Sequence, residues 1–171
     1  MVIPEALQAV FDTLSIGPAC HVHPPLMTSD DAAVQWDRLD GWQVKNLFLK
    51  DAGGQLWLVV LPCEPLVDTK ILATVIGSKR ISFGSAALLL EVLGVTPGSV
   101  TPLAIMNDRQ RQVRLVIHAG IMHLRPLLVH PLINTATLEL QQSDLLRFLA
   151  HHDVMPEIVD LSAAFRQPVS A

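Results

Sequence analysis

The chain has 171 residues, of which half are hydrophobic, 16% are charged and none is tyrosine, and its formal net charge is −4. This length and composition predict one domain with a substantial core and argue against a disordered or low-complexity protein. The negative charge argues against a protein that coats nucleic acid non-specifically, so an RNA partner would have to be held at a small site.

Apolar segments and cysteines bear on the compartment. The longest apolar runs, LWLVVLP at 56–62 and AALLLEVLG at 86–94, are too short to cross a bilayer. The first residues lack the basic start of a signal peptide, so we expect a cytoplasmic protein without a membrane partner. Cys20 and Cys63 are too few and too far apart for a disulfide framework or a thiolate metal site, and we expect reduced thiols.

The N-terminal part is predicted to be mainly helical. Apolar spacing over 3–14 predicts a short helix, and 17–31 has the composition of a loop. Polar residues at 28–31 predict the start of a second helix that ends near Arg38. Residues 1–40 are therefore expected to form a helical arm on a single domain that spans 1–171.

The pattern then changes from helical to strand-like. Two apolar runs, 45–51 and 56–62, flank glycines and predict a β-hairpin. The remaining predicted elements are helices at 68–77, 86–94 and 143–152, short strands at 79–84 and 157–161, a hairpin of 103–107 with 113–119, and strands at 124–131 and 134–140. Together they predict a mixed α/β domain with a mixed, mostly antiparallel sheet of about seven strands surrounded by helices.

Lys45 is unusual within its predicted strand. Side chains alternate along a strand, so Lys45 shares a face with Leu47 and Leu49, while Asn46 lies beside Phe48 on the other. A buried ammonium without a partner would cost several kcal/mol, roughly, so Lys45 needs water, an acidic partner or a pocket that receives an anion.

Familiar catalytic motifs are missing from the sequence. It contains no GxxxxGK[ST], GxGxxG or GxSxG, which argues against nucleotide hydrolysis, dinucleotide chemistry and a serine nucleophile. His21 and His23 offer a metal alternative, but no HExxH motif or carboxylate at ligand spacing supports it. His130, at a strand exit, is compatible with a cleft and equally with a solvent-facing loop.

Two further segments are ambiguous when taken singly. Gly98, with the prolines at 97 and 102, is compatible with a rigid loop that binds a ligand through backbone atoms, and equally with a plain connector. Asn107 and Asp108 are fully explained as the turn of a hairpin.

Taken in order, several segments resemble the free-standing bacterial editing domains related to the insertion domain of prolyl-tRNA synthetase. They resemble most the branch that hydrolyses Ala-tRNA(Pro), over roughly residues 20–160. The matching segments are HPP at 23–25, KNLFLKD at 45–51, LWLVV at 56–60, KRISFGS at 79–85, LGVTPGSVTPLAIMND at 93–108 and HPLINTATLEL at 130–140, followed by SDLLRFL.

This resemblance implies a deacylase whose pocket accepts the 3′ end of a mischarged tRNA. The family's lysine corresponds to Lys45, which would act catalytically, and water is expected to attack with help from the ribose hydroxyl. No metal, cofactor or protein nucleophile is implied. The residues expected to bind substrate are Asn46, Gly98, Ser99, Val100, Thr101, Pro102, Asn107, His130 and Asn134. Val44 departs from the pattern, because a small polar residue is expected before the lysine.

The resemblance also suggests partners and alternatives. The expected partners are the 3′ acceptor end of tRNA(Pro) and prolyl-tRNA synthetase, with no DNA. Alternatives are a deacylase for Cys-tRNA(Pro) or another small amino acid, and a non-catalytic module that binds tRNA or a synthetase. A modest basic rim on the acidic protein is another expectation, with a solvated surface as the alternative; its residues are Lys70, Lys79, Arg80, Arg109, Arg111 and Arg114.

Overall fold

A computed structural model describes residues 2–26 and 38–166. Its helices are α1 (Glu5–Leu14), α3 (Thr69–Val75), α4 (Ala86–Leu93) and α5 (Gln142–His151), with short 3-10 helices η1 (Pro102–Asn107), η2 (Ala119–Ile121) and η3 (Ser162–Ala164). Its strands are β1 (Ala19–Val22), β2 (Trp42–Asp51), β3 (Leu56–Pro62), β4 (Leu66–Val67), β5 (Ile81–Phe83), β6 (Val113–His118), β7 (Leu127–Val129), β8 (Ala136–Leu140), β9 (Glu157–Val159) and β10 (Phe165–Arg166).

One mixed sheet organises the molecule, with strand order β1-β8-β7-β2-β3-β6-β9 and β5 added beside β2. The β2–β3, β2–β5, β7–β8 and β1–β8 pairs are antiparallel, whereas β2–β7, β3–β6 and β6–β9 are parallel. β4 and β10 form a separate two-stranded ribbon. The predicted mixed α/β domain with a large sheet and surrounding helices is confirmed.

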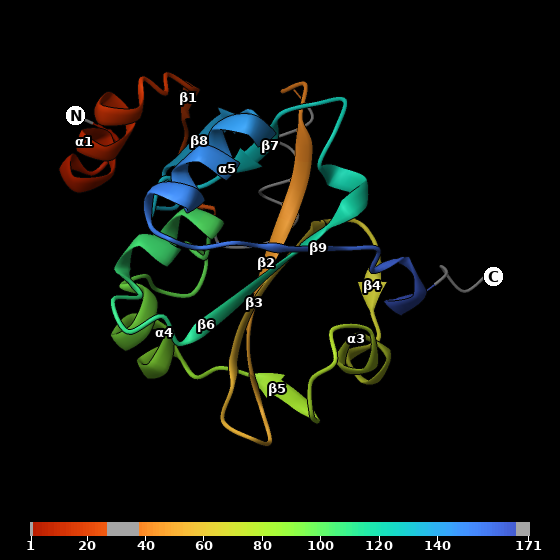
Figure 1. Cartoon of the computed structure of the whole chain (residues 1–171). Helices are drawn as coiled ribbons and strands as arrows, with labels where there is room; N and C mark the ends of the chain where they lie inside the picture. The colour runs from red at the N-terminus through yellow and green to blue at the C-terminus, as the bar shows by residue number, and fades with distance from the viewer. Residues whose placement is uncertain (1, 27–37, 167–171) are drawn as a thin grey trace.

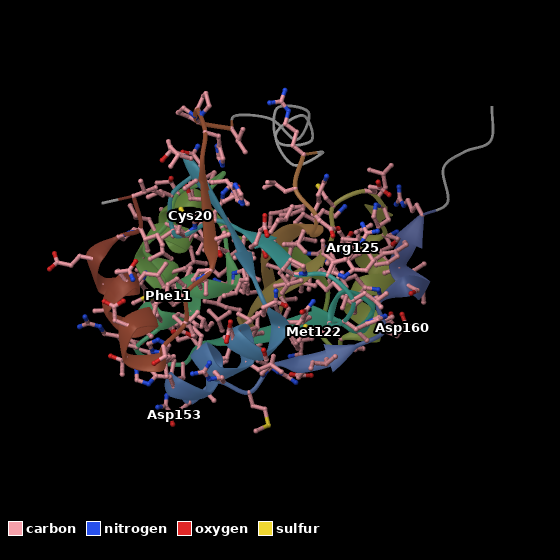
Figure 2. The ribbon with its side chains drawn as sticks, turned by 90° about the horizontal axis from the view of Figure 1, so that it is seen from above. Phe11, Cys20, Met122, Arg125, Asp153 and Asp160 are labelled. Carbon is pink, nitrogen blue, oxygen red and sulfur yellow. The ribbon has the colours of Figure 1, made fainter. Side chains whose placement is uncertain are left out.

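Helices cover both faces of this sheet (Figure 1). The larger core lies between the sheet and α1, α4, α5 and η1, where Phe11 of α1 meets Phe148 of α5 edge to face at 6.0 Å. The smaller core lies under α3 and η3 and contains Trp57 and Leu72. Seen from above, Phe11 and Asp160 mark opposite sides of the molecule (Figure 2).

Polar caps set the helix boundaries that the sequence predicts. The Asp68 carboxylate accepts hydrogen bonds from the backbone N–H groups of residues 70 and 71 at the start of α3. The Ser85 hydroxyl accepts one from the backbone of residue 88 at the start of α4. Gly94 ends α4 with a φ of 65°, a left-handed conformation that glycine adopts without steric cost.

The predicted hairpin of 103–107 with 113–119 is wrong. Residues 102–107 form η1, and β6 instead pairs in parallel with β3 and β9. Pro102 favours a helical start because its φ is fixed and it has no N–H to satisfy. The Thr101 hydroxyl caps η1 by accepting from the Leu103 N–H, and the apolar run of η1 is buried as a helix.

The predicted loop at 17–31 and the helical arm also need correction. Residues 19–22 form β1, which pairs with β8 in the register Cys20↔Leu138. Strand pairing satisfies the backbone groups of a segment whose composition alone looks irregular. The predicted helix at 28–38 falls almost entirely outside the described residues. Among the described helices, none is long and apolar enough to cross a membrane.

Candidate active site

The candidate site lies where β2 and β7 separate. These parallel strands pair at Trp42↔Leu127 and Gln43↔Leu128. On the same side, β2 pairs with β5 only from Leu49 onward. Within the described residues, the edge of β2 between residues 44 and 48 therefore has a strand partner only on its β3 side. A gap in the ladder inside a sheet leaves room for loops and side chains to converge.

Lys45 and His130 lie on the same face of the sheet at this gap. Lys45 is two residues beyond Gln43 and His130 is two residues beyond Leu128, so the alternation of side chains places both on the face of that pair. This face is opposite the core that contains Val44 and Val129. The predicted catalytic lysine and the predicted pocket histidine thus lie on one face of the sheet, Lys45 within β2 and His130 directly after β7.

The Lys45 ammonium is held by backbone carbonyl groups. It donates hydrogen bonds to Cys63 O at 3.1 Å and to Pro65 O. Partial burial lowers the pKa of Lys45, and the nearby Cys63 thiol acts in the opposite direction. Carbonyl oxygens orient the cation without neutralising it, so its positive charge can still attract an anion. This resolves the question of how a half-buried lysine is accommodated in the strand.

His130 is a buried, neutral histidine. Its Nδ1 lies 2.9 Å from Ala136 O, which can only accept, so Nδ1 carries the proton and Nε2 is the acceptor nitrogen. Burial lowers the pKa of His130; the bond to Ala136 acts against this, and His23 lowers the pKa further. A neutral imidazole in a fixed tautomer suits a pocket that must position a substrate hydroxyl or a water molecule.

His23 lies beside His130 and is hydrogen-bonded to Thr137, and the sequence predicts neither His23 nor Thr137 as a substrate-binding residue. The His23 Nδ1 donates to Pro24 O at 2.8 Å, and its Nε2 lies 2.9 Å from the Thr137 hydroxyl. The His23 and His130 rings are 6.1 Å apart. The HPP motif was a usable signal, but the pairing of β1 with β8, which brings His23 to Thr137, could not be read from a loop-like composition.

Asn46 anchors the loop at 98–102 from the opposite face of β2. Its Nδ2 donates to Val100 O at 3.0 Å, whereas its buried Oδ1 accepts no hydrogen bond within the described part of the chain. Exchanging the two amide atoms would set oxygen against oxygen, so this orientation is the favourable one. A buried acceptor without a partner is costly, and a donor on a bound ligand would satisfy it.

Gly98 and Asn134 meet at the other end of this loop. Gly98 has a φ of 89°, and a Cβ added there would lie 3.8 Å from Asn134 Nδ2 and 3.9 Å from Leu26 O. Leu26 is tied to the segment that carries Asn134, because the Leu26 N–H donates to Asn134 O at 3.3 Å. The exposed Gly98 backbone therefore faces the segments that carry Asn134 and Leu26.

The remaining predicted binding residues have structural roles. Ser99 and Thr101 are buried, with the Ser99 N–H donating to Thr96 O at 3.0 Å, and Pro102 opens η1. Asn107, at the far end of η1, donates to Leu93 O at 2.9 Å and packs against Gly94. The structure thus ties Asn107 to the end of α4 rather than to the gap beside β2.

The histidines of the metal alternative have protein partners. His21 Nε2 lies 2.8 Å from Glu139 Oε1, and both ring nitrogens of His23 are engaged. In the part of the chain that the structure describes, no group of three or more His, Cys, Asp or Glu residues could hold a metal ion. Burial raises the pKa of the Cys63 thiol, which disfavours the thiolate needed for nucleophilic attack.

Comparisons with known proteins agree on one family. The family model described as the aminoacyl-tRNA editing domain matches residues 23–148. Prolyl-tRNA editing protein ProX of Acetoanaerobium sticklandii is 35% identical over 143 residues, which cover 82% of this chain and 87% of that protein. Prolyl-tRNA synthetase associated domain-containing protein 1 of Danio rerio is 33% identical over 160 residues, or 91% of this chain and 85% of its own.

A solved structure gives the same result for the fold. A crystal structure described as a candidate trans-editing enzyme for prolyl tRNA synthetase superposes with a TM-score of 0.69 and 15% identity, over 95% of each chain. At that identity, the likeness shows the fold alone. Because the family model spans most of the chain and the curated relatives match nearly end to end, this chain belongs to the aminoacyl-tRNA editing domain family, among its prolyl-tRNA editing members.

Proposed function

We propose that this protein hydrolyses the ester of mischarged Ala-tRNA(Pro) in trans. The observation that carries the proposal is the placement of the Lys45 ammonium and the neutral His130 on one face of the sheet, where β2 and β7 separate. The loop at 98–102, fastened by Asn46, borders the same gap from the other face. The 3′-terminal adenosine is proposed to bind against this loop.

The reaction requires little covalent chemistry from the protein. The oxygen of a water molecule attacks the ester carbonyl carbon, the bond from that carbon to the ribose oxygen breaks, and the ribose oxygen takes up a proton. The products are alanine and free tRNA. Lys45 is proposed to stabilise the negative charge on the carbonyl oxygen in the transition state, while the ribose hydroxyl helps to position the water.

Asn46 is proposed to orient the substrate. One N–H of its Nδ2 is committed to Val100 O, and its buried carbonyl oxygen is the group that lacks a partner within the described residues. A donor must therefore face it, and the α-ammonium group of the aminoacyl moiety or a ribose hydroxyl meets that requirement. Asn46 is therefore proposed to act as a hydrogen-bond acceptor toward the substrate.

Selectivity for alanine over proline is proposed to be steric. A pocket sized for a methyl group excludes the proline ring, whereas a synthetase site built for proline cannot strongly reject the smaller alanine. Editing by a second, smaller site supplies that discrimination. Enlarging the pocket is therefore expected to bring hydrolysis of correctly charged Pro-tRNA(Pro).

Two alternatives remain as outcomes of the same test. A deacylase for Cys-tRNA(Pro) or another small amino acid would use the same pocket. A non-catalytic module that binds a synthetase is suggested by the name of the Danio rerio relative, which refers to an associated domain of prolyl-tRNA synthetase. That name also supports prolyl-tRNA synthetase as a partner.

The test is deacylation of Ala-, Cys-, Ser- and Pro-tRNA(Pro) by the wild type and by Lys45→Met. Methionine keeps an unbranched apolar stem and removes the ammonium. We expect the wild type to prefer Ala-tRNA(Pro), and Lys45→Met to lose about 100-fold or more in rate, because one oxyanion-stabilising donor is worth about that much. Arg111→Gln, a change at an exposed arginine whose charge is already paired with Asp153, serves as the control and should leave the rate unchanged.

The outcomes separate the candidates. Preference for another aminoacyl ester would change the substrate but keep the reaction. Cleavage of none of the four esters by the wild type would favour the binding module. Equal rates for the wild type and Lys45→Met would remove Lys45 from the mechanism.

A further inference from the structure

The structure divides the basic residues of the predicted rim into two groups. Arg111 pairs with Asp153 at 2.6 Å, and Arg114 pairs with Glu157 at 2.5 Å while its guanidinium lies 4.4 Å from the centre of the Trp57 ring. By contrast, the other four form no ion pair with any residue that the structure describes: Lys70, Lys79, Arg80 and Arg109. Exposed cations without carboxylate partners are the ones available to a polyanion.

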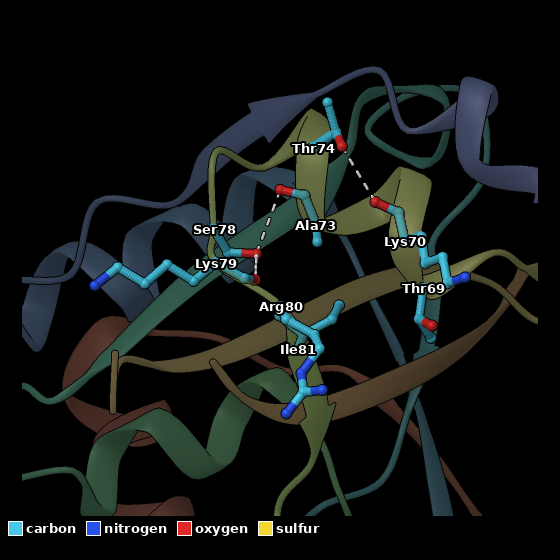
Figure 3. Close-up of a pocket in the computed structure, with 8 residues that line it drawn as sticks. All are labelled: Thr69, Lys70, Ala73, Thr74, Ser78, Lys79, Arg80 and Ile81. Carbon is cyan, nitrogen blue, oxygen red and sulfur yellow. Dashed lines mark hydrogen bonds between the residues drawn. The ribbon is translucent and has the colours of Figure 1, made fainter. Parts of the chain in front are cut away.

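Lys70 and Lys79 line one pocket, between α3 and the segment that leads into β5 (Figure 3). The cavity measures about 490 Å³, and its wall contains three cations and no acid. The lining residues are Thr69, Lys70, Ala73, Thr74, Ser78, Lys79, Arg80 and Ile81. The Thr74 and Ser78 hydroxyls already donate to backbone carbonyl groups, so the ammonium and guanidinium groups of the wall are the donors that phosphate oxygens would accept.

The acidic residues close in sequence to this pocket are already engaged. The Asp68 carboxylate caps α3 and pairs with Arg166 at 3.1 Å. The Asp51 carboxylate accepts hydrogen bonds from the backbone of residues 53 and 55 and from the Trp57 indole. Arg166 balances the charge of Asp68, and the charge that Asp51 keeps is outnumbered by the three cations of the pocket wall. The pocket therefore keeps a local positive charge although the chain as a whole is negative.

An exposed aromatic ring stands beside the pocket. Phe83 of β5 is 66% exposed, and strand alternation places it on the same face as Ile81, which lines the pocket. Phe83 pairs with Leu49 of β2. Lys45 lies four residues before Leu49 in β2 and on the same face. The distance along the strand from Leu49 to Lys45 is roughly 13 Å at 3.3 Å per residue. Phe83 thus lies between the pocket and the candidate active site.

We propose that Lys70, Lys79 and Phe83, which we call the α3–β5 surface, bind the RNA strand that leads to the scissile ester. Lys70 and Lys79 contact backbone phosphates at the pocket, and an unpaired base stacks on Phe83. Cationic grooves with an aromatic platform are the usual way in which proteins hold single-stranded RNA. The proposal rests on the proposed function, because the strand is guided from this surface to Lys45.

Binding of an uncharged RNA tests the surface without requiring hydrolysis. The probe is a synthetic minihelix that carries the tRNA(Pro) acceptor stem and its 3′ CCA end, followed by fluorescence anisotropy at several salt concentrations. Phe83→Leu, which keeps an apolar side chain but removes the ring, should weaken binding between about 5-fold and about 100-fold. Phe83→Trp should restore it.

The contribution of Lys70 and Lys79 should be measurable in the salt dependence of minihelix binding. The double variant Lys70→Gln, Lys79→Gln is expected to lower the slope of log affinity against log salt by about 0.7 for each phosphate that a lysine no longer neutralises. Arg111→Gln, a change at a cation that already has a carboxylate partner, is the matched control and should bind like the wild type. Wild-type affinity and slope in both the Phe83 and the lysine variants would overturn the proposal.

A minimal substrate separates this proposal from the proposed function. Alanyl adenosine carries the ester but lacks the upstream nucleotides, so Phe83→Leu should hydrolyse it at the wild-type rate and lose activity only on Ala-tRNA(Pro). An equal loss on both substrates would place Phe83 in the active site and contradict the RNA-binding role. If the wild type hydrolyses neither substrate, the proposed function fails, while the binding assay still decides the surface.

Discussion

At the scale of a single residue, His130 is buried and is held in one tautomer. The Ala136 carbonyl holds the proton on Nδ1, and burial lowers the pKa of the ring. Protonation would add a charge inside a site that already contains the Lys45 ammonium on the same face. The neutral form is therefore the state in which the proposed pocket can accept a hydrogen bond from substrate or water.

The pH dependence of deacylation should report this state. If neutral His130 is required, its lowered pKa means that activity on Ala-tRNA(Pro) should persist as pH falls through the ordinary histidine value of about 6.5, and decline only below it. His130→Gln should abolish this acidic limb and reduce the rate at neutral pH. Rates are measured from about pH 5 to about pH 8 after subtraction of spontaneous ester hydrolysis.

The matched control is His123→Gln, a change at an exposed histidine. It should keep both the rate and the acidic limb of the wild type. An acidic limb centred above about pH 7, or one that survives in His130→Gln, would show that another group is responsible.

At the scale of elements, the loop at 98–102 is shaped by one glycine. Gly98 adopts a φ of 89°, which other residues adopt only at a cost of roughly 1–2 kcal/mol. An added Cβ would meet its neighbours at ordinary van der Waals distance, since the nearest atom is 3.8 Å away. The cost of a substitution here is therefore conformational rather than steric.

We expect Gly98→Ala to lower the free energy of unfolding by about 1–2 kcal/mol and to weaken binding of the uncharged minihelix. Gly98→Asn should cost less, because asparagine tolerates left-handed conformations better. Urea unfolding and anisotropy measure the two effects. Equal losses for the alanine and asparagine variants would contradict a conformational origin.

The same scale shows how much of the fold could be predicted. The hairpin of β2 and β3 and the capped helices α3 and α4 follow from local signals, namely apolar runs around glycines and the caps at Asp68, Ser85 and Gly94. By contrast, η1 and β1 depend on long-range packing. An apolar run such as 103–105 fits a buried strand or a buried helix, and its partner decides between them.

The candidate site could be predicted only through resemblance. Nothing local to Lys45 or His130 indicates that parallel pairing of β2 with β7 places them on one face. The sequence does not indicate a site role for His23, because β1 has the composition of a loop and the partner of His23, Thr137, is 114 residues away. Asn107 is the opposite case. The resemblance implies that it binds substrate, but its hydrogen bond to Leu93 O accounts for its position without a ligand.

At the scale of the whole molecule, three histidines share a lowered pKa. Burial is the largest cause for His118, His130 and His152. They are spread over the fold: His118 accepts a hydrogen bond from the Leu161 N–H at the C-terminal segment, and His152 packs against Phe148 of α5. Protonation of these rings therefore opposes packing in several places at once.

Stability should fall as pH decreases from about 7 toward about 5. A histidine whose folded pKa lies below its unfolded value of about 6.5 binds more protons when unfolded, so stability is fully present above that pH and declines as pH drops through it. Each ring that titrates contributes at most about 1.4 kcal/mol per pH unit. His152 contributes less to this pH dependence of the free energy of unfolding, because its side chain is only partly buried and solvent screens its charge.

Urea unfolding at about pH 7.5, 6.5 and 5.5 measures this slope. His118→Gln should make the slope shallower, whatever it does to the stability at neutral pH, because one titrating ring is gone. Asp51 and Asp68 do not compete in this window: their pKa values are also lowered, so their contribution is lost only as pH falls below about 3.8 toward their folded values. A stability that stays constant or rises as the pH is lowered over this range would mean that the buried rings are already protonated or are more accessible to water than their burial indicates.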